Sequence, residues 1–136
     1  PEPSAIRVLC SDFKRTHETA ILSASLLGAD PPRLEPALRE RFFGSHEGES
    51  NAAYQGVWDR DRESPGHTEA GVESALATSA RLAAMIMSLE VAGEGQTYLL
   101  VSHGDALQIL QTAFLGESPA THRERPHWPP AEVRAL

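Results

Sequence analysis

The sequence predicts an α/β fold with a parallel central sheet, and three observations support this prediction. An apolar run at 6–10 ("IRVLC") leads directly into a segment whose apolar residues recur at helical spacing. A second continuous apolar run at 97–102 ("TYLLVS") is also followed at once by a helical pattern, and such runs suit parallel strands buried on both faces. A long helical segment at 72–92 lies between the two runs.

The first half of the chain holds one expected helix and one long loop. The helix is expected over 11–28, with Ser11 or Asp12 as its N-cap and Gly28 as its terminator. The charged stretch 33–50 is expected to be mostly loop, because one proline and two glycines interrupt it.

The second half holds three expected helices. They cover 51–63, 72–92 and 103–116, the last of them ending at Gly116. The apolar stripe of the longest helix is expected to consist of Val72, Leu76, Ala83, Ile86 and either Leu89 or Glu90. The segment 132–136 ("EVRAL") is a candidate for the start of a last strand.

Composition limits the class of protein. A length of 136 residues predicts a single domain over 1–136. The formal net charge of −7 disfavours nucleic-acid binding, which depends on Lys and Arg neutralising phosphates. No apolar run approaches the ~18 residues of a membrane span, no signal peptide is recognised, and Cys10 is the single cysteine. We therefore expect a cytoplasmic domain with no membrane and no nucleic-acid partner.

The polar residues most suited to chemistry follow the two apolar strands. In α/β folds, ligand sites lie at the carboxyl ends of strands, where helix N-termini can hold anions. His103 ends the second strand and precedes Gly104, whose N–H could approach an anion; the alternative is a histidine that merely ends a strand. Arg15 lies one turn into the first helix and could clamp a phosphate; the alternative is a surface arginine.

One carboxyl group is a further candidate for a catalytic residue. Glu40 lies between two arginines in "RERFF" and could act as a general acid near a bound phosphate. The alternative is a solvated charge cluster without chemistry.

Three segments taken together indicate a protein family more specifically than any one of them does. "SDFKRTHETA", "LRERFFGSHEGES" and "VSHGDALQIL" follow one another in this order. They resemble the histidine phosphatase superfamily, also called phosphoglycerate mutase-like, over essentially the whole chain. The resemblance implies a three-layer α/β/α architecture with a mostly parallel sheet, and a metal-independent reaction without a cofactor.

The resemblance also implies roles for individual residues. Arg15 matches a phosphate-binding arginine, and His103 matches the second active-site histidine, which contacts the transferring phosphoryl group. Glu40 matches the proton donor to the leaving-group oxygen. Gly104 would offer its backbone N–H to the same oxygens, and Arg41 matches a position that binds phosphorylated substrate in the mutases.

One family motif is missing from the sequence. The family opens with a strand that ends in Arg-His-Gly, whose histidine is the nucleophile and becomes a phosphohistidine. None of the six histidines here follows an arginine and precedes a glycine. Either the first strand and nucleophile belong to the natural protein but not to this sequence, or the protein is a truncated relative. In the first case, residues 1–136 alone are expected to bind apolar dyes and to unfold without a sharp transition.

The resemblance implies a phosphatase that acts on a phosphorylated small molecule or on a phosphoprotein. The compact stretch between Gly44 and Glu73 and the presence of Asp105, where the mutases carry asparagine, favour a phosphatase over a mutase. A phosphate-binding pseudoenzyme without turnover is the alternative from another class. A serine hydrolase is disfavoured because no Gly-x-Ser-x-Gly elbow is present. The sequence leaves a homodimer open.

Overall fold

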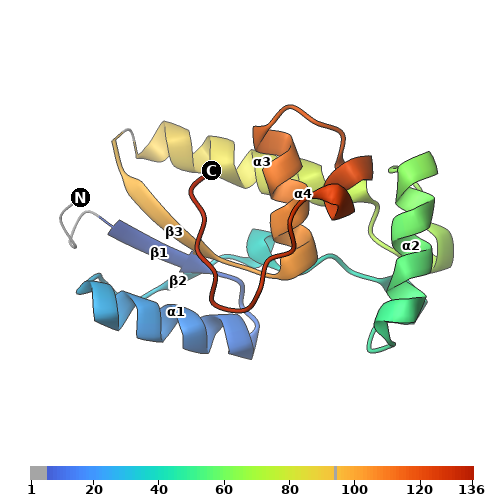
Figure 1. The fold of residues 1–136 in the computed structure, drawn as a ribbon. Helices are drawn as coiled ribbons and strands as arrows, with labels where there is room; N and C mark the ends of the chain where they lie inside the picture. Colours follow the sequence, from blue (N-terminus) through green and yellow to red (C-terminus); the bar gives the residue numbers. More distant parts are fainter. Residues whose placement is uncertain (1–5, 94) are drawn as a thin grey trace. The chain divides into compact units, whose positions relative to one another are not determined.

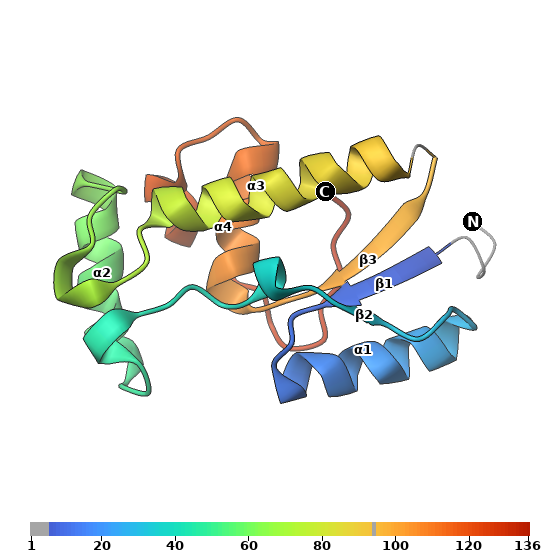
Figure 2. The same cartoon turned by 180° about the vertical axis from the view of Figure 1, so that it is seen from behind.

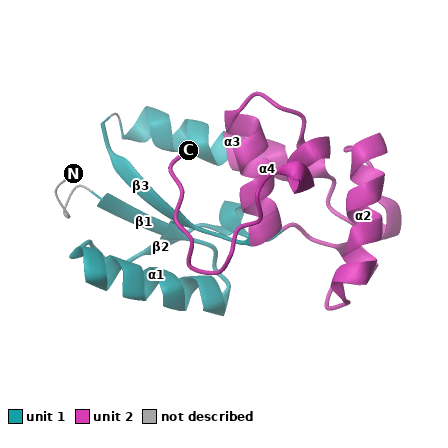
Figure 3. Ribbon diagram, in the orientation of Figure 1, with its two compact units in different colours: residues 1–40, 84–103 teal, residues 41–83, 104–136 magenta. Residues whose placement is uncertain are grey.

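The computed structural model describes residues 6–93 and 95–136, and these divide into two compact units. Unit 1 comprises 1–40 and 84–103, and unit 2 comprises 41–83 and 104–136 (Figure 3). The helix α3 (Ala75–Ala92) contributes its first half to unit 2 and its second half to unit 1.

Unit 1 is built on a three-stranded parallel sheet. The strands β1 (Ile6–Cys10), β2 (Arg33–Leu34) and β3 (Thr97–Val101) are arranged in the order β2-β1-β3. Leu9 pairs with Arg33 on one side, and Cys10 pairs with Val101 on the other. The predicted parallel sheet is confirmed, whereas β2 lies in a stretch predicted to be mostly loop.

Helices cover both faces of this sheet. The helix α1 (Lys14–Leu27) packs Ala20 and Ala24 against Val8 and Cys10, which share one face because side chains alternate along a strand. Leu9 is buried on the opposite face. Figures 1 and 2 place the second half of α3 on that other side of the sheet from α1. The predicted three-layer arrangement is therefore present in unit 1.

The start of α1 differs from the prediction. Phe13 is the N-cap residue and makes no side-chain capping bond. Neither Ser11 nor Asp12 caps the helix, because the Ser11 hydroxyl is engaged with Thr16 and the Asp12 carboxylate with Arg39. At the other end, Gly28 ends the helix in the left-handed conformation at φ 62°, as predicted.

The strand β3 is less buried than predicted. Leu99, Leu100 and Val101 are half-buried rather than enclosed on both faces. Within the part of the chain that the structure describes, β3 pairs with β1 along one edge and no strand pairs with its other edge. The segment 132–136, considered as a last strand, is irregular.

Unit 2 contains an aromatic core cluster to which α2 contributes. The helix α2 (Asn51–Glu63) has the bounds that the sequence predicted, and α4 (Gly104–Phe114) starts directly after His103. Short 3-10 helices complete the unit: η3 (Gly44–His46), η4 (Glu69–Gly71) and η5 (Pro119–Glu124). The core cluster consists of Phe43, Val57, Trp58 and Val72, with Tyr54 packed against it.

The helix α3 begins three residues later than predicted, and its buried stripe agrees with the predicted one only in part, at Leu89. Its buried side chains include Ala75, Leu82, Met85 and Leu89, whereas Leu76 is 49% exposed. This helix carries apolar side chains on all of its faces. The periodicity of the sequence alone therefore does not predict which face is buried. The segment Glu69–Ala92 is long and apolar enough to cross a membrane by length and composition alone, which core helices of soluble proteins also satisfy.

Candidate active site

Arg15 and His103 lie against each other in unit 1. Arg15 is in the first turn of α1, directly after β1, and His103 follows the end of β3. Because β1 and β3 are adjacent parallel strands, their carboxyl ends meet at one edge of the sheet. The Arg15 Nη2 atom lies 3.0 Å from His103 Nδ1. Thus the structure brings together the two residues that the sequence singled out for phosphate binding.

The hydrogen bonds around His103 define its tautomer. A guanidinium only donates, so Nδ1 of His103 accepts from Arg15. The proton of the neutral ring is then on Nε2, which lies 2.9 Å from the Ser11 hydroxyl oxygen and donates to it. The His103 side chain is buried at 5% exposure, whereas Arg15 is exposed.

Ser11 and Thr16 form a buried layer beneath His103. The Thr16 hydroxyl donates to the backbone carbonyls of Ser11 (3.1 Å) and Phe13 (2.9 Å). The Ser11 and Thr16 hydroxyl oxygens lie 2.9 Å apart and share a hydrogen bond. The sequence pattern predicted Ser11 as a helix cap, because nothing local in the sequence indicates its contact with His103, 92 positions away.

Phe13 packs beside both candidate side chains. Its ring meets the His103 ring edge-on at a centroid distance of 5.0 Å, and the Arg15 Cζ atom lies 5.4 Å from its centroid. A guanidinium over an aromatic face is favourable, by about 0.5–1 kcal/mol at an exposed site. Phe13 thus restricts the positions of both side chains.

Glu40 is half-buried, and its neighbours tie its segment to the same edge of the sheet. Arg39 donates to both carboxylate oxygens of Asp12, at 2.7 and 2.6 Å, and its hydrogen bonds hold the pKa of Asp12 below its usual range. The Ser102 hydroxyl donates to the Leu38 carbonyl at 2.7 Å. The residues flanking Glu40 are therefore joined to residues that directly follow β1 and β3.

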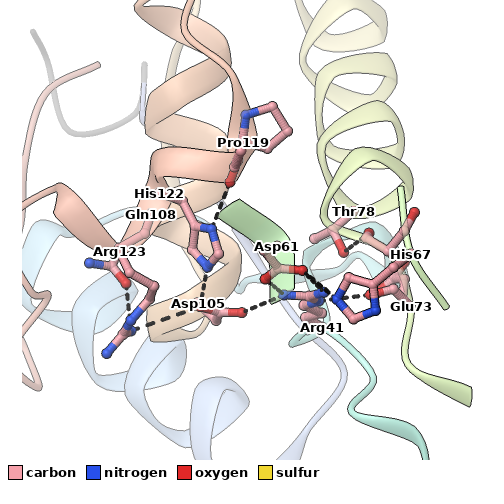
Figure 4. A network of polar contacts seen from close by, with 12 residues as sticks. Arg41, Asp61, His67, Glu73, Thr78, Asp105, Gln108, Pro119, His122 and Arg123 are labelled. Atoms are coloured by element: carbon pink, nitrogen blue, oxygen red, sulfur yellow. Dashed lines mark hydrogen bonds and ion pairs between the residues drawn. The ribbon is translucent and has the colours of Figure 1, made fainter. Parts of the chain in front are cut away.

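Arg41 lies inside unit 2 rather than on a ligand-binding surface (Figure 4). Its guanidinium is fully buried and donates to both carboxylate oxygens of Asp61, at 2.6 and 2.8 Å. Its Nε atom donates to the Glu73 carbonyl at 2.7 Å. This arrangement gives Arg41 an interior role and offers no support for the prediction that it binds substrate.

The buried network continues through Asp105 to His122. Asp105 Oδ2 lies 3.6 Å from Arg41 Nη1, and Asp105 Oδ1 lies 2.8 Å from His122 Nε2. The other ring nitrogen of His122 lies 2.7 Å from the Pro119 carbonyl, which can only accept. Burial would raise the pKa of Asp105, but the hydrogen bond and charge of His122, with the charges of Arg41 and Arg123, lower it overall. Asp105 is thus a buried carboxylate that helps hold α4 to η5.

Gly104 is the first residue of α4 and follows His103 in the chain. It is half-buried, and a Cβ built on it would meet no atom within 4 Å. Its expected N–H contact with an anion stays a prediction. Among residues 6–93 and 95–136, no group of three or more His, Cys, Asp or Glu side chains could hold a metal ion.

Comparison with known proteins decides the family. The sequence model of the histidine phosphatase superfamily (branch 1) matches residues 2–136. This chain belongs to that superfamily. No curated protein matches it.

Solved structures of histidine phosphatases share the fold. A mycobacterial glucosyl-3-phosphoglycerate phosphatase matches with a TM-score of 0.74 and 25% identity, over 89% of this chain and 64% of that chain. The α-ribazole phosphatase from Shigella flexneri matches with a TM-score of 0.66 and 28% identity, over 87% and 60%. A protein titled mycobacterial hydrolase 2 matches with a TM-score of 0.77 and 22% identity, over 92% and 58%. The chain thus spans about three fifths of the length of these proteins.

Proposed function

We propose that this protein is a phosphomonoester hydrolase that acts through a phosphohistidine intermediate. The observation that carries the proposal is the contact between Arg15 and His103 at the carboxyl edge of the sheet. Membership of the histidine phosphatase superfamily and the phosphatase names of two structural neighbours support the same reaction class.

In the proposed reaction, Arg15 and His103 bind the equatorial oxygens of the phosphoryl group. Arg15 is the exposed cation of the pair and offers planar N–H donors that match a phosphate. Preorganised donors of this kind stabilise the charge that develops during phosphoryl transfer. Phe13 and the Ser11–Thr16 layer hold both side chains in place before the substrate arrives.

Glu40 is the proposed proton donor to the departing oxygen. It lies in the segment that the Ser102–Leu38 and Arg39–Asp12 contacts fix beside β1 and β3. The attacking histidine is proposed to lie outside residues 1–136, because the chain contains no Arg-His-Gly motif. Water then hydrolyses the phosphohistidine and releases inorganic phosphate.

The proposed substrate is a phosphorylated small molecule in the cytoplasm, with a phosphoprotein as the second class to be tested. One structural neighbour is named for glucosyl-3-phosphoglycerate and another for α-ribazole, and both are titled phosphatases. These names favour hydrolysis of small phosphomonoesters over a mutase reaction.

The natural protein, encoded by the whole reading frame, should be assayed against a panel of small phosphomonoesters and a phosphopeptide. Hydrolysis is expected, and His103→Ala should reduce turnover about 10²–10³-fold, as loss of an oxyanion donor does. Glu40→Gln should slow esters with poor leaving groups more than esters with good ones. Glu49→Gln, a change at an exposed carboxylate of another segment, is the control and should leave turnover unchanged.

A phosphate-binding pseudoenzyme is the second candidate, because the paired donors of Arg15 and His103 suit an anion whether or not turnover follows. It predicts that the natural protein binds inorganic phosphate through Arg15 and His103 but hydrolyses no member of the panel. Turnover that depends on His103 excludes this candidate.

A further inference from the structure

The helix α3 is apolar on a face that lies exposed in the structure. Its buried side chains include Met85 and Leu89, which lie along one side of the helix. On the opposite side, Met87 is 64% exposed and Val91 is 89% exposed. Of the most apolar 18-residue stretch within Glu69–Ala92, 28% is buried, whereas a helix that is apolar all round is normally buried all round. The outer face of α3 is therefore an apolar surface that lacks a partner among the described residues.

Five exposed residues form a continuous seam along this outer face. They follow one another in steps of three and four residues, which places them on one side of an α-helix. The α3 seam consists of Ala77, Ala80, Ala84, Met87 and Val91, all of them exposed. Because α3 is one unbroken helix, this spacing is kept along its length. Alternating steps of three and four residues are the pattern of helices that pair side by side.

The α3 seam carries no charge. Arg81 and Glu90 are the two charged residues of α3, and neither belongs to the seam. Arg81 is held by Glu73, with Nε and Oε2 at 2.7 Å. A helix that faces water normally carries charged residues on its exposed side. The composition of the seam therefore fits contact with another apolar surface better than contact with water.

The order of small and large residues along the seam matches a second copy of the same seam. When two seams face each other in antiparallel with Ala84 opposite Ala84, Val91 of each copy lies opposite Ala77 of the other. In the same arrangement, Met87 lies opposite Ala80. Large side chains then meet small ones on both sides of the centre, which fills the contact without overlap. A parallel pair would set Val91 against Val91 and alanine against alanine, so one end would be crowded and the other end loosely packed.

We propose that the α3 seam is a homodimer interface, in which two copies of this chain pair their α3 helices in antiparallel about a two-fold axis at Ala84. Both copies use the same patch, as a two-fold symmetric dimer requires. A contact made by one pair of helices lies below the ~1,200 Å² of standard interfaces, so the dimer is expected to dissociate on dilution. The inference is independent of the proposed function, because no residue of the candidate active site takes part in it.

The oligomeric state of the natural protein, encoded by the whole reading frame, tests the interface. Sedimentation velocity over a range of concentrations should show a monomer–dimer equilibrium for the wild type. Val91→Glu sets a carboxylate against an alanine within the contact and should raise the dissociation constant about 10-fold or more. Leu26→Glu is the matched control, because Leu26 on α1 is also 89% exposed, and it should dimerise as the wild type does.

Cysteine cross-linking tests the antiparallel register separately. Cys10, the single cysteine of residues 1–136, is fully buried, and the wild type oxidised in parallel gives the background. Ala84→Cys should form a disulfide between two copies, because this residue meets its own counterpart at the axis. Ala77→Cys should not cross-link to itself, but it should do so when mixed with Val91→Cys.

Three results would overturn the inference. They are a monomer at every concentration, a dimer that Val91→Glu leaves unchanged, and cross-linking of Ala77→Cys to itself as readily as that of Ala84→Cys. A monomeric wild type whose thermal stability falls in Val91→Glu but not in Leu26→Glu would show that another part of the natural protein covers the seam. Binding of a monomeric wild type to phospholipid vesicles, lost in Val91→Glu, would assign the seam to a membrane surface instead.

Discussion

The guanidinium of Arg15 and the imidazole of His103 meet at 3.0 Å although 88 positions separate them in the chain. Each follows one of two neighbouring parallel strands, and the register that pairs Cys10 with Val101 brings the two turns together. The sheet therefore fixes this contact, and the sheet and the contact belong to the same compact unit.

Arg41 should matter for stability rather than for anion binding. Removing its charge leaves the buried Asp61 carboxylate without its bidentate cation and removes one of the cations beside Asp105, so Arg41→Met should destabilise the protein by about 3–5 kcal/mol. Urea denaturation measures this loss. Arg62→Met, which removes an exposed arginine 3.8 Å from Asp59, should cost less than about 1 kcal/mol. Equal effects of the two substitutions would contradict the buried network.

Asp105 should make the free energy of unfolding decrease as the pH falls below neutral. Its pKa is lowered in the folded protein, so its ionised form stabilises the fold above the unfolded pKa of about 3.9. That contribution disappears as the pH falls through the lower folded pKa. Asp105→Asn should reduce stability at neutral pH and flatten the acid limb of a urea-stability profile. Asp59→Asn, at an exposed carboxylate, should keep the wild-type profile; a wild-type profile in Asp105→Asn would argue against an ionised Asp105.

Two glycines with similar backbone angles should respond differently to alanine. Gly44 has φ +59° and its added Cβ would lie 2.1 Å from the Ala70 carbonyl oxygen, whereas Gly48 has φ +78° and open space around it. Gly48→Ala should cost about 1 kcal/mol from backbone strain alone. Gly44→Ala adds a backbone overlap and should cost on the order of 3 kcal/mol. Thermal or urea unfolding of the pair checks this, and similar costs would show that η3 and η4 do not pack as described.

Much of the fold follows from patterns that are local in the sequence. The two apolar runs, Gly28 and the bounds of α2 are of this kind, and the structure has each of them. The proximity of Arg15 and His103 was also predictable, because parallel strands place the turns that follow them at one edge.

The remaining features depend on contacts between distant parts of the chain. "RERFF" reads as a charged loop, yet Arg41 is drawn inside by Asp61, twenty positions away. Ser11 reads as a helix cap, yet its hydroxyl is held by Thr16 and His103. The buried face of α3 was predicted only in part, with Leu89 buried but Leu76 exposed, because apolar residues occur all around that helix.

The most direct test of the anion site is a titration of the protein with inorganic phosphate, followed by the NMR signals of the His103 ring and the Arg15 side chain. Saturable shifts of both groups are predicted, with affinity falling about 10-fold or more in Arg15→Gln and in His103→Gln, since each removes a charge-assisted hydrogen bond. Arg33→Gln, which removes an exposed arginine that lies 3.9 Å from Glu35, should bind phosphate as the wild type does. Phosphate binding that is unchanged in Arg15→Gln and His103→Gln would contradict the assignment of the site.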